Sequence, residues 1–346
     1  MEGTLARATI KDVAKASGLS VSTVNRALHE PGKVSEHTLQ AMLQAAESIG
    51  FYGIGSIRQG LKSIRPKLRV GVLLLQRSRA FYKSLAMALE GAVAAVRDHD
   101  VLMQIEYLEE LSPQNVSEGL ERLAQKADVI GVVAPEHPIV SATIERLSEN
   151  GKKVFALVSQ LTARCSVGYI GLDAWKVGRT AGWAFDNLCA HSGKIGILVG
   201  NHRFRCQETN ESGFRSYFRE HASGFTLLEP QSTFENANIA REVTEHILLK
   251  HPDLAGLFIS GGGISGAVAA LRDSGRGRDI VAVGYDLMDV TRTALLDGTL
   301  NFLIAHPMAR LAQEALDAMI RAFDGGPDFP PQTVSLPFDI YTSENL

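Results

Sequence analysis

The chain has 346 residues, of which 45% are hydrophobic and 21% are charged, as expected for a globular protein of two or three domains. No stretch reaches the roughly 18 uninterrupted apolar residues of a membrane helix, and the first residues, MEGTLARATIK, lack the apolar core of a secretory signal. We therefore expect a cytoplasmic protein without a membrane partner. The net charge of −3 conceals an asymmetry, because residues 1–69 carry ten Lys and Arg against five Asp and Glu, whereas the remainder carries 25 against 33. A basic segment on an acidic body indicates a polyanionic partner for that segment alone.

The first predicted elements are two short helices joined by a tight turn, within residues 9–28. Thr9 begins the first helix, and Asp12 three residues later can accept a hydrogen bond from the free backbone N–H, as in a capping box. Gly18 stands where the chain must leave this helix, a position that favours positive φ. Ser20 is then the natural N-cap of the second helix.

The outward face of the second helix carries small, amide, guanidinium and imidazole side chains, namely Val21, Ser22, Asn25, Arg26 and His29. Asn and Arg can read base edges in the major groove of DNA, and a small apolar group can touch a thymine methyl. The same composition also fits a helix face that is only solvated. A third predicted helix over residues 36–49 favours the first interpretation, because three short capped helices make a compact helix-turn-helix unit.

The run TIKDVAKASGLSVSTVNRAL, followed by VSEHTLQAMLQAAESIGF, resembles the DNA-binding head of the LacI/GalR family of bacterial transcription regulators. The resemblance implies a helix-turn-helix domain over residues 1–52 whose second helix enters the major groove. The base-contacting positions would then be Val21, Ser22, Asn25 and Arg26. Four hydroxyl side chains would lie near phosphates by the same likeness: Thr9, Ser20, Thr23 and Ser35.

Residues 53–68 are predicted to be a hinge or linker, because glycine, proline and basic side chains dominate and the apolar content is too small for a core. We expect this segment to be mobile alone and ordered on DNA. In LacI-type proteins the matching segment is a hinge helix whose leucine enters the minor groove, and Leu61 holds that position here; such a wedge bends the duplex. Gly60 departs from the family and costs a helix about 1 kcal/mol relative to Ala. A plain flexible linker with an exposed leucine is the alternative.

From Arg69 onward, short apolar runs alternate with amphipathic helices. Strands are predicted at 70–75, 101–107, 129–133, 154–158, 195–199, 257–260 and 280–284. Continuous apolar strands separated by helices indicate parallel sheets covered on both faces, and this many units favour two doubly wound α/β subdomains. The expected fold class is therefore α/β, with a small all-α head in front.

The order of these units resembles the periplasmic sugar-binding fold that forms the body of LacI-type regulators. The resemblance implies a two-lobed sensor domain over residues 69–346. One lobe would hold about 69–172 and 304–326, and the other about 173–303 and 327–346. The strand ends of both lobes would then face a common cleft, where doubly wound sheets bind ligands.

Polar and aromatic side chains that follow the predicted strands are candidates for effector contacts. They are Arg77, Phe81, Glu136, Arg205, Asn210, Asp286 and His306. Carboxylates, amides and guanidiniums beside a stacking ring suit a polyhydroxylated ligand, because each hydroxyl is both donor and acceptor. Phe81 fits the core equally well, and His306 fits a strand-end turn. The resemblance assigns a sugar contact most firmly to Asp286, whereas Asn210 stands where the family often has arginine and His306 near a usual glutamine.

Nothing in the sequence points to an enzyme. No Ser/His/Asp, metal-type or paired-carboxylate arrangement is evident, and the triple glycine at 261–263 lacks the lysine of a phosphate-binding loop. Cys165, Cys189 and Cys206 have no metal-type spacing and fit a reducing compartment. We therefore expect no catalytic residue, no metal and no cofactor.

The expected function is a ligand-responsive transcription regulator, a repressor of carbohydrate-related genes that binds double-stranded operator DNA. A single head reads about half an operator, so a homodimer would read a pseudopalindrome. The effector would be a sugar or sugar derivative. The alternative is a sugar-binding or sugar-processing protein whose helical head has another role.

Overall fold

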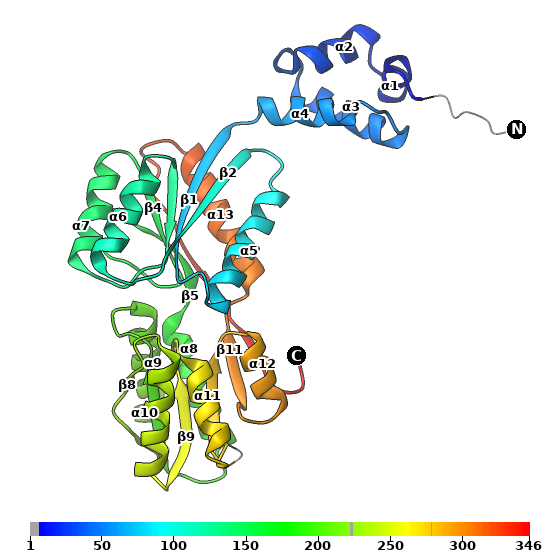
Figure 1. Cartoon of the computed structure of the whole chain (residues 1–346). Helices are drawn as coiled ribbons and strands as arrows, with labels where there is room; N and C mark the ends of the chain where they lie inside the picture. Colours follow the sequence, from blue (N-terminus) through cyan, green and yellow to red (C-terminus); the bar gives the residue numbers. More distant parts are fainter. Residues whose placement is uncertain (1–6, 222–223, 278) are drawn as a thin grey trace, which may run out of the picture. The chain divides into compact units, whose positions relative to one another are not determined.

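The computed structural model describes residues 7–221, 224–277 and 279–346. The chain divides into two compact units, one formed by the chain up to Leu68 together with Ala95–Leu102, and the other by Arg69–Ala94 and Met103–Leu346. The first is largely helical and is called the head here; the second contains two α/β lobes (Figure 1). The predicted fold class is thus confirmed. In the part of the chain that is described, no helix is both long and apolar enough to cross a lipid bilayer.

The head begins with short helices whose starts follow the predicted capping signals. Its elements are α1 Ile10–Ser17, α2 Val21–His29, the 3₁₀ turn η1 Pro31–Lys33, α3 Glu36–Ser48 and α4 Ile54–Ile64. The Asp12 carboxylate accepts the backbone N–H of Thr9 at 2.8 Å. The hydroxyl oxygens of Ser20 and Ser35 accept the backbone N–H groups three residues on, at 3.1 and 3.2 Å. Gly18, with φ of 70°, ends α1 as its conformational freedom allows.

The segment 53–68, predicted to be mobile alone, is mostly helix α4 packed on the head. Ile54, Ile57, Leu61 and Ile64 recur at helical spacing and form an apolar stripe. Ile57 and Leu61 are only 0% and 3% exposed, within the cluster that joins α1, α2 and α3. In this conformation Leu61 is therefore not accessible for the predicted minor-groove contact, and the alternative of a flexible linker with an exposed leucine is wrong. Packing against the other helices of the head removes the apolar stripe from water, which is favourable.

Gly60 serves close packing here. A Cβ atom at this position would lie 3.0 Å from Cβ of Pro31 in η1, so the absent side chain lets α4 approach the turn. Arg58 adds an ion pair with Glu47 of α3 at 2.8 Å. Glycine lowers the stability of helix α4, but it permits the close contact with Pro31 that a larger residue would block.

We expect Leu61→Ala to destabilise the head by about 2–4 kcal/mol, the usual cost of a Leu→Ala cavity in a core. Hydrogen exchange of the full-length protein should show faster exchange across α2 and α4, with the two lobes unchanged. Gln59→Ala, an exposed change on the same helix, should leave exchange as it is. Unchanged protection of the head in Leu61→Ala would contradict the packing described here.

The first lobe is built on a sheet of order β12-β5-β4-β3-β1-β2. Its strands are β1 Lys67–Leu75, β2 Asp100–Leu108, β3 Val129–Val132, β4 Lys153–Leu157, β5 Gly168–Leu172 and β12 Thr333–Leu336. Its helices are α5 Ala80–Ala95, α6 Pro113–Ala124, α7 Pro138–Glu149 and α13 Met308–Asp324. Helices α6 and α7 pack together on one face and α13 lies on the other (Figure 1).

The second lobe repeats this plan with the order β13-β11-β10-β9-β6-β7, and β8 also pairs with β6. Its strands are β6 Lys194–Val199, β7 Thr226–Leu227, β8 Gln231–Ser232, β9 Leu254–Ile259, β10 Val281–Tyr285, β11 Phe302–Ala305 and β13 Asp339–Tyr341. Its helices are α8 Ala174–Leu188, α9 Arg205–His221, α10 Ala237–Lys250, α11 Ile264–Asp273 and α12 Asp289–Leu296. Helices α8 and α9 pack as one pair, and α10 and α11 as another.

The lobe boundaries near the C-terminus differ from the predicted ones. Strand β11 at 302–305 belongs wholly to the second sheet, so the chain crosses after Ala305. Strand β12 pairs in parallel with β5 of the first sheet, so assigning 327–346 as a whole to the second lobe was wrong. The last crossing follows Leu336, at the end of β12. The sequence did not predict this strand because its residues, TVSL, form no continuous apolar run.

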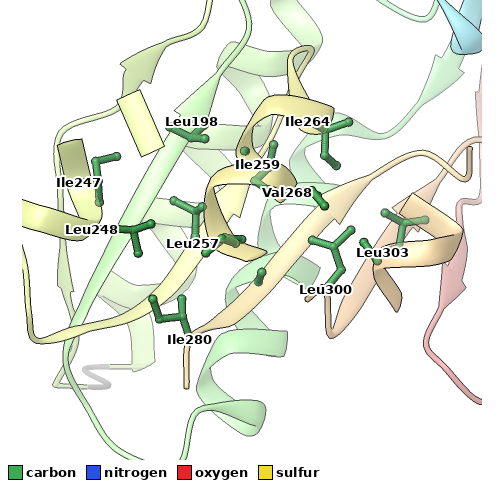
Figure 2. Close-up of a cluster of buried hydrophobic side chains, with 14 of the residues drawn as sticks. Leu198, Ile247, Leu248, Leu257, Ile259, Ile264, Val268, Ile280, Leu300 and Leu303 are labelled. Carbon is green, nitrogen blue, oxygen red and sulfur yellow. The ribbon is translucent and has the colours of Figure 1, made fainter. Parts of the chain in front are cut away.

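The core of the second lobe shows why its elements pack as they do (Figure 2). Leu198, Leu257 and Ile259 come from neighbouring strands and meet Ile264 and Val268 of α11. Each is nearly or completely buried, and such a side chain stabilises the fold by about 1.5–3 kcal/mol relative to exposure. On the other face of this sheet, Phe214 of α9 stacks on Phe258 of β9 with ring centroids 4.7 Å apart.

Candidate functional site

The outward face of α2 in the head is the first candidate site. Val21, Ser22, Asn25, Arg26 and His29 are all exposed, whereas Val24 and Ala27 between them are buried. Val21 is 41% exposed. An amide, a guanidinium and a small apolar group therefore stand together on one helix face, which is the chemistry that reads base edges.

The hydroxyl positions lie close to the start of that face. Ser20 exchanges hydrogen bonds with the hydroxyls of Ser22 and Thr23, each at 2.8 Å, at the N-terminus of α2. Thr9 and Ser35 are exposed at the starts of α1 and α3. Helix N-termini and hydroxyls are favourable partners for phosphate oxygens. Leu61 does not belong to this surface, since the head core covers it.

The second candidate site is a cavity of about 410 Å³ in the two-lobed unit. It is lined by residues that follow β1, β3, β4, β9, β10 and β11, so the strand ends of both sheets contribute to it. Its volume lies in the usual range of small-molecule sites. Of the predicted contacts, four line it: Phe81, Asn210, Asp286 and His306.

Asp286 and His306 form a buried pair on the floor of this cavity. The Asp286 Oδ1 atom accepts both the backbone N–H of His306 at 2.9 Å and a hydrogen bond with its Nδ1 at 2.8 Å. The rings of Phe81 and Tyr285 each meet the imidazole edge-on, with centroids 5.5 Å away. Asp286 has φ of 63°, a left-handed conformation that Asp tolerates better than most residues. No described residue donates to its Oδ2.

Arg79 and Glu235 form a second charged pair, which the sequence analysis missed. Arg79 Nη1 lies 2.8 Å from Glu235 Oε2, and Nη2 donates to the Glu235 carbonyl oxygen at 2.7 Å. Gln207 Nε2 donates to Glu235 Oε1 at 2.7 Å. Arg79 stands two residues beyond the predicted Arg77, at the start of α5, while Glu235 lies in a turn before α10 that no sequence pattern distinguishes.

Asn210 is buried and its amide is used mainly within its own lobe. With the amide oriented to satisfy both ends, its nitrogen donates to the carbonyl oxygens of Ala174 at 2.8 Å and Cys206 at 3.1 Å. Its oxygen then faces the hydroxyl of Ser260, 3.4 Å away. Asn210 therefore joins α9 to the start of α8 as well as lining the cavity.

The other three predicted contacts lie elsewhere. Arg77 stacks over the Tyr107 ring, with the guanidinium 5.6 Å from its centroid. Glu136 accepts hydrogen bonds from the backbone and hydroxyl of Thr162. Arg205 lines a separate surface pocket near β5. Their prediction as cavity-lining residues was wrong, because a loop at a strand end can turn a side chain away from the cleft as easily as into it.

The cavity offers binding groups and no activated nucleophile. Cys206 lines it, but burial raises the pKa of this thiol to about 12, so it stays protonated. Burial also raises the pKa of Tyr285 well above its usual value, which keeps the phenol neutral. Among the described residues, no cluster of three or more His, Cys, Asp or Glu side chains is placed to hold a metal ion.

Comparison with known proteins covers both parts of the chain. Residues 9–53 match the family described as bacterial regulatory proteins, lacI family, and residues 70–327 match the periplasmic binding protein domain. The ribose operon repressor of Bacillus subtilis is 24% identical over 324 residues, which is 90% of this chain and 91% of that repressor. The HTH-type transcriptional regulator GalS of Salmonella typhimurium is 24% identical over 326 residues, 92% of this chain and 90% of GalS.

A solved structure shows the same fold for the body. The solute-binding protein of an Agrobacterium vitis ABC transporter, bound with α-D-tagatopyranose, superimposes with a TM-score of 0.73 and 19% identity. The superposition covers 80% of this chain and 95% of the solute-binding protein. The relatives named here are regulators and binding proteins, not enzymes.

A helix-turn-helix head and a two-lobed binding body in one chain define a ligand-responsive, DNA-binding regulator of transcription. The regulators above share this layout over nearly their whole length. The chain belongs to the lacI family of bacterial regulatory proteins, with a body of the periplasmic binding protein domain family.

Proposed function

We propose that the protein is a sugar-responsive repressor of carbohydrate-related genes. The observation that carries this proposal is the cavity in which Asp286, His306 and two aromatic rings converge, in the same chain as an exposed Asn and Arg on α2. Sugar hydroxyls suit such a site, because a carboxylate oxygen accepts from them and the rings cover apolar ring faces. An effector that prefers one arrangement of the lobes changes operator affinity by its differential binding.

The names of the relatives support a monosaccharide as effector. They include a ribose operon repressor and a binding protein solved with α-D-tagatopyranose. A binding protein of Actinobacillus succinogenes was solved with D-allose. D-ribose, D-tagatose and D-allose therefore make the first set of ligands to test, and this set is called the sugar panel below.

The working form is proposed to be a cytoplasmic homodimer. Two heads related by a two-fold axis would read a pseudopalindromic operator, which a single head cannot hold tightly. Strand β2 is an outer strand of the first sheet, and its Leu102 is 69% exposed, so this edge offers a surface for a second copy. The described cysteines are all free thiols, in keeping with a reducing compartment.

The test is selection of DNA from a random library by the full-length protein, followed by titration of the selected site with the sugar panel. We expect a pseudopalindromic site and at least one sugar that changes its affinity by about 5- to 150-fold. Binding of a sugar without any DNA sequence preference would favour the alternative, a sugar-binding protein whose head has another role. Sequence-specific binding that no sugar alters would contradict the sugar assignment.

Arg26→Ala should weaken binding to the selected site by about 1–3 kcal/mol, the value of one bidentate base contact, and leave sugar binding intact. Arg26→Lys is the matched variant, because it keeps the charge and loses the planar fork. It should retain affinity for random DNA and lose preference for the selected site. Fluorescence anisotropy with both duplexes measures this, and equal preference in wild type and Arg26→Lys would remove the base-reading role.

A further inference from the structure

The described charged side chains that line the cavity carry no net positive charge. Among the described residues that line it, Arg79 is the one guanidinium, and the carboxylates are those of Glu235 and Asp286. No lysine stands among the described lining residues. The imidazole of His306 is directed at Asp286 through Nδ1. A ligand in this cavity therefore meets no uncompensated positive charge from these side chains.

The Glu235 carboxylate accepts hydrogen bonds from two groups in addition to Arg79. One carboxylate oxygen meets Arg79 Nη1 at 2.8 Å, and the other accepts from Gln207 at 2.7 Å and from the backbone N–H of Gly262 at 3.4 Å. The Arg79 and Glu235 side chains are only 22% and 11% exposed. Glu235 comes from the second lobe, between β8 and α10, whereas Arg79 precedes α5 of the first.

This arrangement makes Arg79 unfit to receive an anion. Both terminal nitrogens of the guanidinium already donate to Glu235, one to its carboxylate and one to its carbonyl oxygen. Other N–H groups of the guanidinium remain, but its charge is already neutralised by Glu235. A phosphate or carboxylate group entering the cavity would therefore meet no free positive charge and would lie near the carboxylates of Glu235 and Asp286. Burying such an unpaired charge is costly, whereas a hydroxyl carries no such penalty.

We propose that Glu235 determines the charge class of the effector: by neutralising Arg79 it admits uncharged polyhydroxylated ligands and excludes phosphorylated or acidic ones. The proposal rests on the proposed function of the cavity as the effector site. It makes Glu235 a specificity-determining residue that need not touch the sugar itself, and it gives Gln207 the supporting role of fixing the carboxylate in place.

Calorimetric titration of the full-length protein tests this with the sugar panel, D-ribose 5-phosphate and inorganic phosphate. In the wild type we expect free D-ribose to bind at least about 100-fold more tightly than its phosphate, and inorganic phosphate not to bind measurably. Glu235→Gln keeps the shape and frees the guanidinium. It should bind inorganic phosphate at least about tenfold more tightly than the wild type and reduce the preference for ribose over its phosphate by a similar factor.

Two further variants keep the result interpretable. Glu211→Gln removes a carboxylate of similar burial that pairs with Arg215 at 2.7 Å outside the cavity, and it should gain no phosphate binding. Adding Arg79→Met to Glu235→Gln should abolish the gain. If phosphate binding persists in this double variant, Arg79 is not the anion's partner and the proposal is overturned.

The proposal is also overturned if the wild type binds ribose 5-phosphate as tightly as ribose, or if folded Glu235→Gln gains no phosphate binding. The comparison of ribose with ribose 5-phosphate uses only the wild type, so it can still overturn the proposal if Glu235→Gln fails to fold. A wild type that binds no sugar of the panel counts against the sugar assignment instead. Inorganic phosphate then still decides the role of Glu235, because that measurement does not depend on the identity of the effector.

Discussion

Asp286→Asn should shift the effect of sugar on operator binding to about 10- to 100-fold higher sugar concentrations, while operator affinity without sugar stays within about twofold of the wild type. The carboxylate Oδ2 is the acceptor left open to a ligand, and the substitution turns one acceptor into a donor. A hydrogen bond to a charged group contributes about 1.5–3 kcal/mol, so sugar affinity should fall by about 10- to 100-fold. Calorimetry for the sugar and anisotropy for the operator measure the two quantities separately.

Asparagine is the suitable replacement because Asp286 has a φ of 63°, and Asn tolerates this left-handed conformation where Ala would be strained. Its side-chain oxygen can still accept the hydrogen bonds from His306. Asp253→Asn is the matched control, because Asp253 pairs with Lys194 on the surface of the same lobe. A sugar response that occurs in Asp286→Asn at the same sugar concentration as in the wild type would move the effector site away from this pair.

Phe214→Ala should lower the free energy of unfolding of the second lobe by about 3–5 kcal/mol, the usual cost of removing a buried phenyl ring. The Phe214 ring is fully buried and lies 4.7 Å from that of Phe258, 5.0 Å from Phe218 and 5.6 Å from Phe185. It therefore joins α8, α9 and β9, and its removal leaves a cavity that three elements would have to fill.

Urea unfolding followed by tryptophan fluorescence measures this change directly, because Trp175 and Trp183 both lie on α8 of the same lobe. Phe234→Ala is the control, since that ring is 69% exposed and surface substitutions usually change stability by less than about 0.5 kcal/mol. A loss in Phe214→Ala no larger than in Phe234→Ala would contradict the role of the aromatic cluster.

The head was largely predictable because its helix starts depend on local chemistry. Ser20, Ser35 and Asp12 make their hydrogen bonds within three residues, so the sequence contains both partners. The burial of Leu61 was not predictable in this way. It depends on whether the apolar stripe of α4 finds a complementary surface, and that surface is assembled from three other helices.

In the body, most strands with continuous apolar runs were predicted, although β11, which reads FLIA, was missed. The other missed strands lack such a run. Strand β5 reads GYIGL, and its glycines interrupt the apolar run. The structure gives them another purpose, because a Cβ at Gly168 would lie 2.2 Å from the Phe155 ring. Small residues that make room for a neighbouring aromatic ring are set by tertiary packing, which periodicity along the chain does not reveal.

The cavity lies at the strand ends of both sheets, where the rule for doubly wound folds predicts it. The charged side chains Arg79 and Glu235 in it were not predicted. Asp286 was found because an acid directly after an apolar strand is uncommon, and His306 because it stands near a position where the family often has glutamine. Arg79 and Glu235 are far apart in the chain, and nothing local indicates that they meet. Arg77 and Glu136 were chosen for their residue type, and only the direction of each loop decides whether such a side chain enters the cavity.

The path of the final residues makes an edge of each sheet depend on one short segment of the chain. Strand β12 forms an outer edge of the first sheet, and β13, a few residues later, forms an outer edge of the second. A nick near Pro331 would therefore uncover backbone donors and acceptors on two sheets at once, and bare strand edges promote aggregation. Removal of residues 332–346 by carboxypeptidase or by truncation is expected to yield insoluble protein, whereas a tag added after Leu346 would leave β12 and β13 in place.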